Sequence, residues 1–494
     1  MQRQQITLDS FHCGDRAEPE TSSGEAPSMS GTESVDTGPY DHLMKAVIDD
    51  NNIDEALKRV VGNRGAPGVD GMDVTELEPW LKLNREFLKD ELESVRYAPT
   101  PVRRKEIPKD SGGTRKLGIP TVCDRLVQQM IAQVLEPLYD PTFSESSYGF
   151  RPGRSAVDAV MKVREYYDQG YVMAVGIDLE KFFDTIQHDF MMNILRERIK
   201  DKTLIHIIKK FLRAGVVLPN GLTEATWEGA PQGGPLSPLL SNIYLDKLDK
   251  ELEARGLKFC RYADDSLILV RSRRSAERVC ESVTRFVEKD LKLRVNREKT
   301  EIGSPKTLKF LGFKLSRTSS GTGLTPHPKA IAKFKKTVRG ITKRNRGISV
   351  GKMLEELKEF MKGWIGYYGA TTRSNRFKEL DEWVRRRVRQ FIFKKWKNKY
   401  TRVRNLMALC PPYWQMPNGR PTLEWVQQCW GAVRSDSYWQ AVKHSAVHKA
   451  MNNSWLKGQG MFFLMDDWEA VKERWTNRRM PSGTYGGVRG QPMA

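Results

Sequence analysis

The sequence predicts an α+β fold, with a mixed central part and a mainly helical C-terminal part. Between residues 120 and 325, helical patterns such as 124–138 alternate with short apolar strands such as 266–270. Upstream, the strand patterns 103–107 and 114–119 flank a Gly-rich turn, which is typical of a hairpin. Beyond residue 325, apolar residues recur at helical spacing among many cations. A chain of 494 residues is long enough to form several domains.

The start of the chain differs from the rest in composition. Residues 1–40 are rich in Ser, Thr, Gly and acidic residues and contain few large apolar groups, which predicts a disordered acidic leader. Residues 41–95 read as helices interrupted by the turn-rich stretch 64–71, which we interpret as a loop. At the other end, residues 401–494 show only weak helical patterning.

Net charge is the most informative bulk property. The 82 Lys and Arg residues outnumber the 61 Asp and Glu residues, which gives a net charge of +21 and a pI near 9.6. This excess favours a polyanionic partner, although a cation-rich surface that only confers solubility would look the same. The six cysteines form no C-x-x-C pair, which argues against a zinc ribbon or a disulfide framework. No apolar run approaches the ~18 residues of a membrane span.

Two carboxylate motifs stand at the ends of predicted strands. An apolar strand ends on Asp178, and two apolar arms meet at Asp264 and Asp265, which predicts a hairpin with these acids at its tip. Two-metal phosphoryl transfer needs carboxylates that hold two divalent ions roughly 3.5 to 4 Å apart. Oxygen ligands suit Mg²⁺. A lone Asp-Asp pair is more often a solvated turn, so the residues alone leave both interpretations open.

The order of the motifs decides between these interpretations. Tyr262-Ala-Asp-Asp265, downstream of the Asp178 segment, resembles the palm motifs of reverse transcriptases. Between them lies a Gly-rich stretch, 229–242, where that family has a loop leading into a helix. More specifically, the chain resembles the group II intron-encoded proteins, which are bacterial reverse transcriptases and maturases. Further matching stretches are 115–120, 147–153, 293–300, 310–313 and 363–368.

The resemblance, which extends from about residue 45 to 400, implies a right-hand polymerase. Residues 41–95 would form an N-terminal extension with a lid-like loop, and residues 96–325 the reverse transcriptase fingers and palm. Residues 326–400 would form the helical thumb and maturase domain, and residues 401–494 a region that binds RNA or DNA. Many members continue into a nuclease domain built on paired cysteines and histidines, which this sequence lacks.

The resemblance also implies roles for single residues. Asp178, Asp264 and Asp265 would be catalytic and would bind two Mg²⁺ ions together with Leu179. The nucleotide would be bound by six residues, with Phe183 excluding a 2′-hydroxyl: Lys109, Arg115, Phe183, Gln232, Gly233 and Lys299. For Lys299 a solvated surface lysine is nearly as good an interpretation. Nucleic-acid contacts would come from Arg64, Arg151, Arg385, Arg386, Arg387, Arg389, Lys394 and Lys395.

The implied function is RNA-directed DNA polymerisation that copies intron RNA into DNA for retrohoming. The chain would also bind its own group II intron RNA to assist splicing. Its partners would be the intron RNA, an RNA template with a DNA primer, target DNA and dNTPs, without a membrane, in the bacterial cytoplasm or nucleoid. One alternative is a related bacterial reverse transcriptase for defence or repair. Another is a splicing factor without polymerase activity, against which the intact Tyr262-Ala-Asp-Asp265 motif argues.

Overall fold

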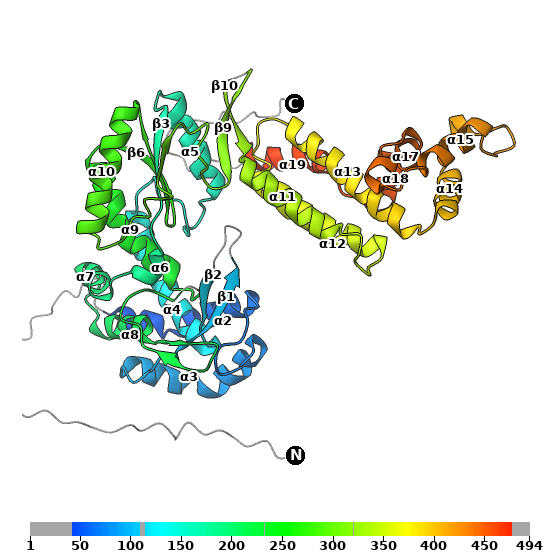
Figure 1. Ribbon diagram of the computed structural model, residues 1–494. Helices are drawn as coiled ribbons and strands as arrows, with labels where there is room; N and C mark the ends of the chain where they lie inside the picture. Colours follow the sequence, from blue (N-terminus) through cyan, green and yellow to red (C-terminus); the bar gives the residue numbers. More distant parts are fainter. Residues whose placement is uncertain (1–41, 109–113, 232, 320, 477–494) are drawn as a thin grey trace, which may run out of the picture.

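The computed structural model describes residues 42–108, 114–231, 233–319 and 321–476 (Figure 1). The side chains of Arg115 and of residues 474–476 are not part of this description. The predicted acidic leader, Lys109 and Gln232 therefore lie outside the described residues. The mixed α+β class is confirmed, and helices make up most of the fold. No helix in the described ranges is long and apolar enough to cross a bilayer.

The N-terminal helices are α1 (Leu43–Val47), α2 (Asp50–Gly62), the 3₁₀ turn η1 (Val74–Glu76) and α3 (Leu77–Glu93). Of these, α1 and α2 pack against α4 (Val122–Tyr139), and α3 packs against α1 and α2. The turn-rich stretch is a loop between α2 and η1. Arg125 and Arg103 donate to the carbonyl oxygens of Ala66 and Pro67, each at 2.6 Å. A Cβ on Gly68 would lie 2.6 Å from the Cα of Thr121, so this close approach requires glycine.

The predicted hairpin forms the core of a four-stranded sheet with the order β2-β1-β4-β5, which we call the fingers sheet because it lies in the part predicted to form the fingers. Strand β1 (Val102–Pro108) pairs antiparallel with β2 (Thr114–Ile119) in the register Arg103↔Ile119. The short strand β4 (Val216–Val217) then runs parallel to β1, and β5 (Thr223–Glu224) pairs antiparallel with β4. A second segment, about a hundred residues later in the sequence, thus completes the sheet.

A second four-stranded sheet has the order β6-β7-β3-β8, and we call it the palm because it lies in the part predicted to form the palm. Its central strands are β3 (Met173–Ile177) and β7 (Asp265–Val270), flanked by β8 (Glu301–Gly303) and β6 (Lys258–Tyr262), and all pairs are antiparallel. Alternate residues bury on opposite faces. Ala174 and Leu267 pack in the same cluster as α5 (Ala156–Asp168), whereas Val175 and Ile268 share a cluster with α9 (Ser237–Ala254) and α10 (Arg273–Lys289).

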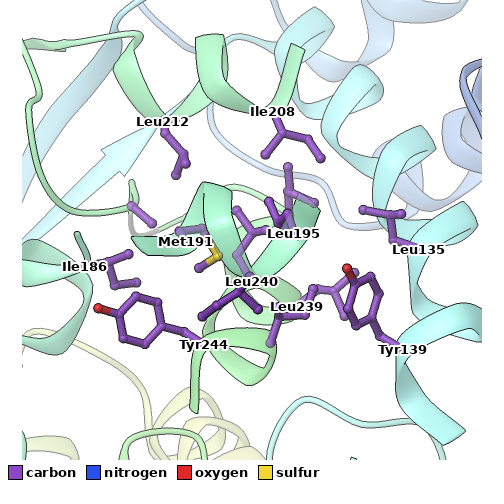
Figure 2. Packing of buried hydrophobic residues seen from close by; sticks show 14 of the residues in the cluster. Leu135, Tyr139, Ile186, Met191, Leu195, Ile208, Leu212, Leu239, Leu240 and Tyr244 are labelled. Carbon is purple, nitrogen blue, oxygen red and sulfur yellow. The ribbon is translucent and has the colours of Figure 1, made fainter. Parts of the chain in front are cut away.

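The largest core joins the palm to the fingers (Figure 2). Its layers include α4, α7 (His188–Arg198), α8 (Lys202–Arg213) and α9. Leu135 of α4, Leu195 of α7 and Leu240 of α9 belong to this cluster, and each is at most 2% exposed. The remaining short helices of this half are η2 (Asp140–Thr142) and α6 (Phe182–Thr185). Because one core spans both parts, the residues that face the gap between them are held on a rigid base.

The C-terminal half extends away from the palm (Figure 1). A hairpin of β9 (Phe313–Thr318) and β10 (Gly321–Pro326) leads into three long helices: α11 (Pro328–Ile341), α12 (Val350–Tyr368) and α13 (Asn375–Lys395). Shorter helices follow, namely α14 (Lys399–Ala408), η3 (Pro412–Trp414), α15 (Leu423–Ala432), α16 (Tyr438–Ala441), α17 (Ser445–Ala450), α18 (Asn453–Gly458) and α19 (Leu464–Thr476). Most are too short for a helical repeat to be recognised in the sequence.

Helices on both sides of residue 400 share one hydrophobic core. The chain returns through α19, which packs against α12 and α13. Asp381 of α13 fixes this return, because its carboxylate accepts hydrogen bonds from the backbone amides of Leu464 at 2.9 Å and Met465 at 3.0 Å. Burial raises the pKa of Asp381 to about 6. The expected division at residue 400 therefore does not separate two cores.

Candidate active site

A cleft of about 780 Å³ lies between the fingers sheet and the palm. One wall comes from β1 and β2, and the other from the residues that follow β3 and from the loop 226–231. Five of the residues with predicted catalytic, metal or nucleotide roles line this cleft: Asp178, Leu179, Phe183, Asp264 and Lys299. The fold thus gathers most of the described candidates in one place.

The antiparallel register explains why the two acidic motifs meet. Ile177 pairs with Ser266, so the end of β3 lies beside the start of β7. Tyr262 pairs with Asp265, which leaves Ala263 and Asp264 as the two turn residues. Asp264 is at the tip of this hairpin, as predicted, whereas Asp265 is the first residue of β7 and is not among the residues that line the cleft.

The carboxylates crowd one another at this edge of the sheet. The side chain of Asp265 is exposed. The surrounding protein nevertheless desolvates its carboxylate and raises its pKa, and the charges of Asp264 and Asp178 raise it further, against the opposing effect of Lys309 and Lys299. The ammonium of Lys299 lies 3.6 Å from the carboxylate of Asp178. Crowding of this kind favours cation binding, since a bound cation relieves the repulsion.

The described residues contain no cluster of three or more His, Cys, Asp or Glu side chains close enough to enclose a metal ion. Magnesium does not require such a cage, because it is usually held by one or two carboxylates together with substrate phosphates. Asp178 and Asp264 offer two carboxylates that face an open cleft. These residues fit Mg²⁺ that is completed by a bound triphosphate.

The nucleotide-binding candidates occupy different positions. Phe183 is half-buried on the cleft wall, and its ring lies edge-on to Phe182 at a centroid distance of 5.3 Å. Gly233 has a φ of +134°, and a Cβ there would lie 2.4 Å from the carbonyl oxygen of Gly118. Glycine is therefore required where this loop meets the fingers strand. Arg115 pairs with Ile107 in the fingers hairpin.

Sequence reasoning missed four cations that line the cleft: Arg104, Lys116, Lys181 and Arg294. On the fingers wall the lining residues are Val102 and Arg104 from β1, and Thr114, Lys116, Leu117 and Gly118 from β2, most of them spaced two positions apart. Side chains two apart in a strand share a face. The sequence predicted the two strands of this hairpin and therefore their alternation. It did not indicate which face of the hairpin turns toward the palm.

A histidine that sequence reasoning also missed supports the loop before Gly233. The Nε2 atom of His188 lies 2.6 Å from the carbonyl oxygen of Gly229, and burial lowers the pKa of this imidazole. The amide of Ala230 donates to the carbonyl oxygen of Phe183 at 2.7 Å. A Cβ on Gly229 would lie 2.9 Å from that same oxygen. The loop is therefore fixed against the helical turn that carries Phe183.

The residues that were predicted to contact nucleic acid differ in their exposure to solvent. Arg64, Lys394 and Lys395 are exposed. Arg151 is only 7% exposed, and it donates to Asp140 and to the carbonyl oxygen of Ser144, both at 2.6 Å.

The four predicted arginines of α13 contact neighbouring segments. Arg389 is 6% exposed and donates to the carbonyl oxygen of Met451 at 2.7 Å. Arg385, Arg386 and Arg387 are partly buried. Burial of Arg151 and Arg389 does not fit the direct nucleic-acid contact predicted for them.

Comparison with known proteins gives two family matches. A family described as reverse transcriptase (RNA-dependent DNA polymerase) matches residues 107–315, which include the whole set of cleft aspartates. A family described as group II intron, maturase-specific domain matches residues 331–414, which extend from α11 to η3.

Individual relatives agree with these matches. Protein YkfC of Escherichia coli (strain K12) is 34% identical over 322 residues, covering 57% of this chain and 84% of that protein. Group II intron-encoded protein LtrA of Lactococcus lactis subsp. cremoris is 31% identical over 336 residues, covering 54% and 55%. The putative COX1/OXI3 intron 2 protein of Saccharomyces cerevisiae is 43% identical over 166 residues, covering 34% and 19%. The match thus covers about half of LtrA and a fifth of the yeast protein.

Proposed function

Because this chain belongs to the group II intron reverse transcriptase/maturase family, we propose that it copies RNA into DNA in the cleft that contains Asp178 and Asp264. Its reverse transcriptase domain covers residues 107–315. The proposal rests on one observation. Asp178 and Asp264, which are 86 positions apart in the sequence, lie on one wall of the cleft, and Arg104 and Lys116 lie on the opposite wall.

The residues of the cleft would have different roles in the proposed reaction. Asp178 and Asp264, with the backbone at Leu179, would hold two Mg²⁺ ions, and Asp265 would support them through its charge. When bound, these ions neutralise the triphosphate and increase the nucleophilicity of the primer 3′-oxygen. The protein itself contributes positioning and charge complementarity.

The fingers and palm walls would bind different parts of the incoming nucleotide. Lys116, which lines the cleft, would bind the triphosphate together with Lys109 and Arg115. Phe183 would lie under the sugar and exclude a 2′-hydroxyl, while Gln232 and Gly233 would shape the pocket. The additional cleft cations Lys181, Arg294 and Lys299 would meet the leaving pyrophosphate.

We also propose that the chain is the maturase of its own group II intron. Binding of group II intron RNA is implied by its maturase-specific domain, and the net charge of +21 suits a polyanion. Exposed cations of the thumb, Lys394 and Lys395, and of the N-terminal loop, Arg64, are the proposed contacts. Arg151 and Arg389 are left out of this surface because they are buried. Retrohoming into target DNA, in the bacterial cytoplasm or nucleoid, would follow from both activities.

Primer extension tests the polymerase. The purified chain, an RNA template, a DNA primer, dNTPs and Mg²⁺ should yield cDNA. Asp178→Asn should abolish this synthesis, while Asp189→Asn should leave it intact, because Asp189 is an exposed acid outside the cleft. An inactive wild type would refute the proposal, and so would an active Asp178→Asn protein. A wild type that makes cDNA but does not promote splicing of its flanking RNA would instead point to a reverse transcriptase for defence or repair.

A further inference from the structure

One buried arginine links the hairpin that carries Asp264 to neighbouring segments of the palm. Arg261 stands in β6 immediately before the Tyr262-Ala-Asp-Asp265 motif, and its side chain is 1% exposed. Its guanidinium donates to both carboxylate oxygens of Asp249, from Nε at 2.8 Å and from Nη2 at 2.5 Å. The carboxylate of Asp249, in the middle of α9, is fully buried. A charged pair of this kind persists in a core only when its hydrogen bonds are satisfied.

The remaining donors of Arg261 reach the segments around the turn. Nη1 donates to the side-chain oxygen of Asn242 at 3.0 Å and to the carbonyl oxygen of Ala263 at 3.1 Å. Nη2 donates to the hydroxyl of Ser147 at 2.8 Å. The bond to Ala263 is the direct link, since Ala263 is the turn residue next to Asp264. One guanidinium therefore joins α9, the loop before α5 and the catalytic turn.

The turn itself needs such support. Ala263 has a φ of +56°, a left-handed conformation that is unfavourable for a residue with a side chain. Gly149 packs directly behind it, and a Cβ there would lie 2.2 Å from the backbone nitrogen of Ala263. Asn242, which Arg261 also contacts, donates to the carbonyl oxygen of Gly149 at 2.8 Å. The strained turn is thus enclosed by groups that Arg261 holds together.

We propose that Arg261 is a positioning residue of the polymerase. Its hydrogen bonds to the Ala263 carbonyl and to Asn242 fix the position of Asp264, and the carboxylate of Asp249 balances the charge of its guanidinium. This inference rests on the proposed polymerase function. It also assigns a role to two conspicuous stretches of the sequence, because Ser147 and Gly149 belong to 147–153 and Asn242 closes 229–242. These stretches form the frame of the catalytic turn.

A double variant separates positioning from stability. Arg261→Met alone leaves the carboxylate of Asp249 buried without its partner, so the protein should unfold at a lower temperature. Arg261→Met with Asp249→Leu removes both charges and should regain thermal stability. Its single-turnover rate with saturating dNTP should nevertheless be about 100-fold lower, the cost of a misplacement of about 1 Å. The apparent dNTP affinity should change by less than about threefold, because the fingers contacts are intact.

Two further variants complete the test. Arg261→Lys keeps the charge but cannot reach Asp249, Asn242 and Ala263 together, so its rate should be intermediate. Arg85→Met, which breaks the pairing of an arginine with Asp50 and Asp54 between α2 and α3, should lower stability without changing the rate. A folded double variant with the wild-type rate would overturn the inference. So would an equal loss of rate in Arg85→Met. An inactive wild type would refute the proposed polymerase instead.

Discussion

The Nε2 atom of His188 lies 2.6 Å from the carbonyl oxygen of Gly229, at the base of the loop that leads to the nucleotide pocket. Burial lowers the pKa of this histidine, and the hydrogen bond to Gly229 opposes that shift only in part. At neutral pH the ring is therefore neutral and donates its Nε2 proton to the carbonyl. The loop depends on a group that titrates in an accessible range.

The stability of the fold should consequently depend on pH through His188. Its folded pKa lies below that of the unfolded chain, about 6.5, so the unfolded state binds more protons. The contribution is complete above that pKa and is lost as the pH falls through it toward the folded pKa. The Tm of the wild type should decrease on acidification, and that of His188→Gln should decrease less. As a control, His206→Gln changes an exposed histidine. Parallel Tm curves for wild type and His188→Gln would contradict this.

Phe183→Ala should admit ribonucleotides. The ring of Phe183 lines the cleft against Phe182, and its removal opens space where a 2′-hydroxyl would otherwise collide. The ratio of kcat/KM for dNTP over rNTP should fall, mainly through faster rNTP incorporation. Phe183→Tyr retains the ring and should keep the preference. An unchanged ratio in Phe183→Ala would mean that another residue selects the sugar.

Lys116→Gln should weaken dNTP binding. A lost hydrogen bond to a charged group costs about 1.5 kcal/mol or more, which is roughly tenfold in apparent affinity. The matched control is Lys105→Gln, an exposed lysine of β1 that does not line the cleft. Single-turnover extension at increasing dNTP concentrations measures both. Equal affinities for the two variants would place the triphosphate away from β2.

The thumb cations should differ in what they contribute. Replacing the exposed Lys394 and Lys395 by Gln should weaken RNA binding and flatten its salt dependence by up to ~0.7 log units per log salt for each lost contact to a single strand. Arg389→Gln should instead lower the Tm, because it alters the buried donors to the carbonyl of Met451. Binding measured across salt concentrations tests the first expectation, and a salt slope unchanged from wild type would move the RNA elsewhere.

The sequence predicted that Asp178 and Asp264 each follow an apolar strand, a pattern that local periodicity reveals, and the structure places both at the cleft. The sequence did not indicate which face of the fingers hairpin meets the palm, so Lys116 was missed although its neighbour was chosen. Charge in a sequence also says nothing about burial. For that reason Arg151 was predicted to bind nucleic acid, whereas its guanidinium supports a loop. Arg261 was passed over because its partners lie on three other segments.

The proposed protein combines a metal-dependent polymerase with separate recognition of intron RNA in one chain. Asp264→Asn removes one charge from the metal site while keeping the size of the side chain, so the fold and the exposed thumb cations should be preserved. RNA recognition relies on cations and shape contacts elsewhere.

The decisive measurement uses purified wild type and Asp264→Asn with the RNA that flanks this reading frame. It records cDNA synthesis on a primed template and the formation of ligated exons at low magnesium. The mutant should lose cDNA synthesis and still promote exon ligation. Retained cDNA synthesis would refute the catalytic assignment, and loss of both activities in a folded mutant would mean that one site serves both.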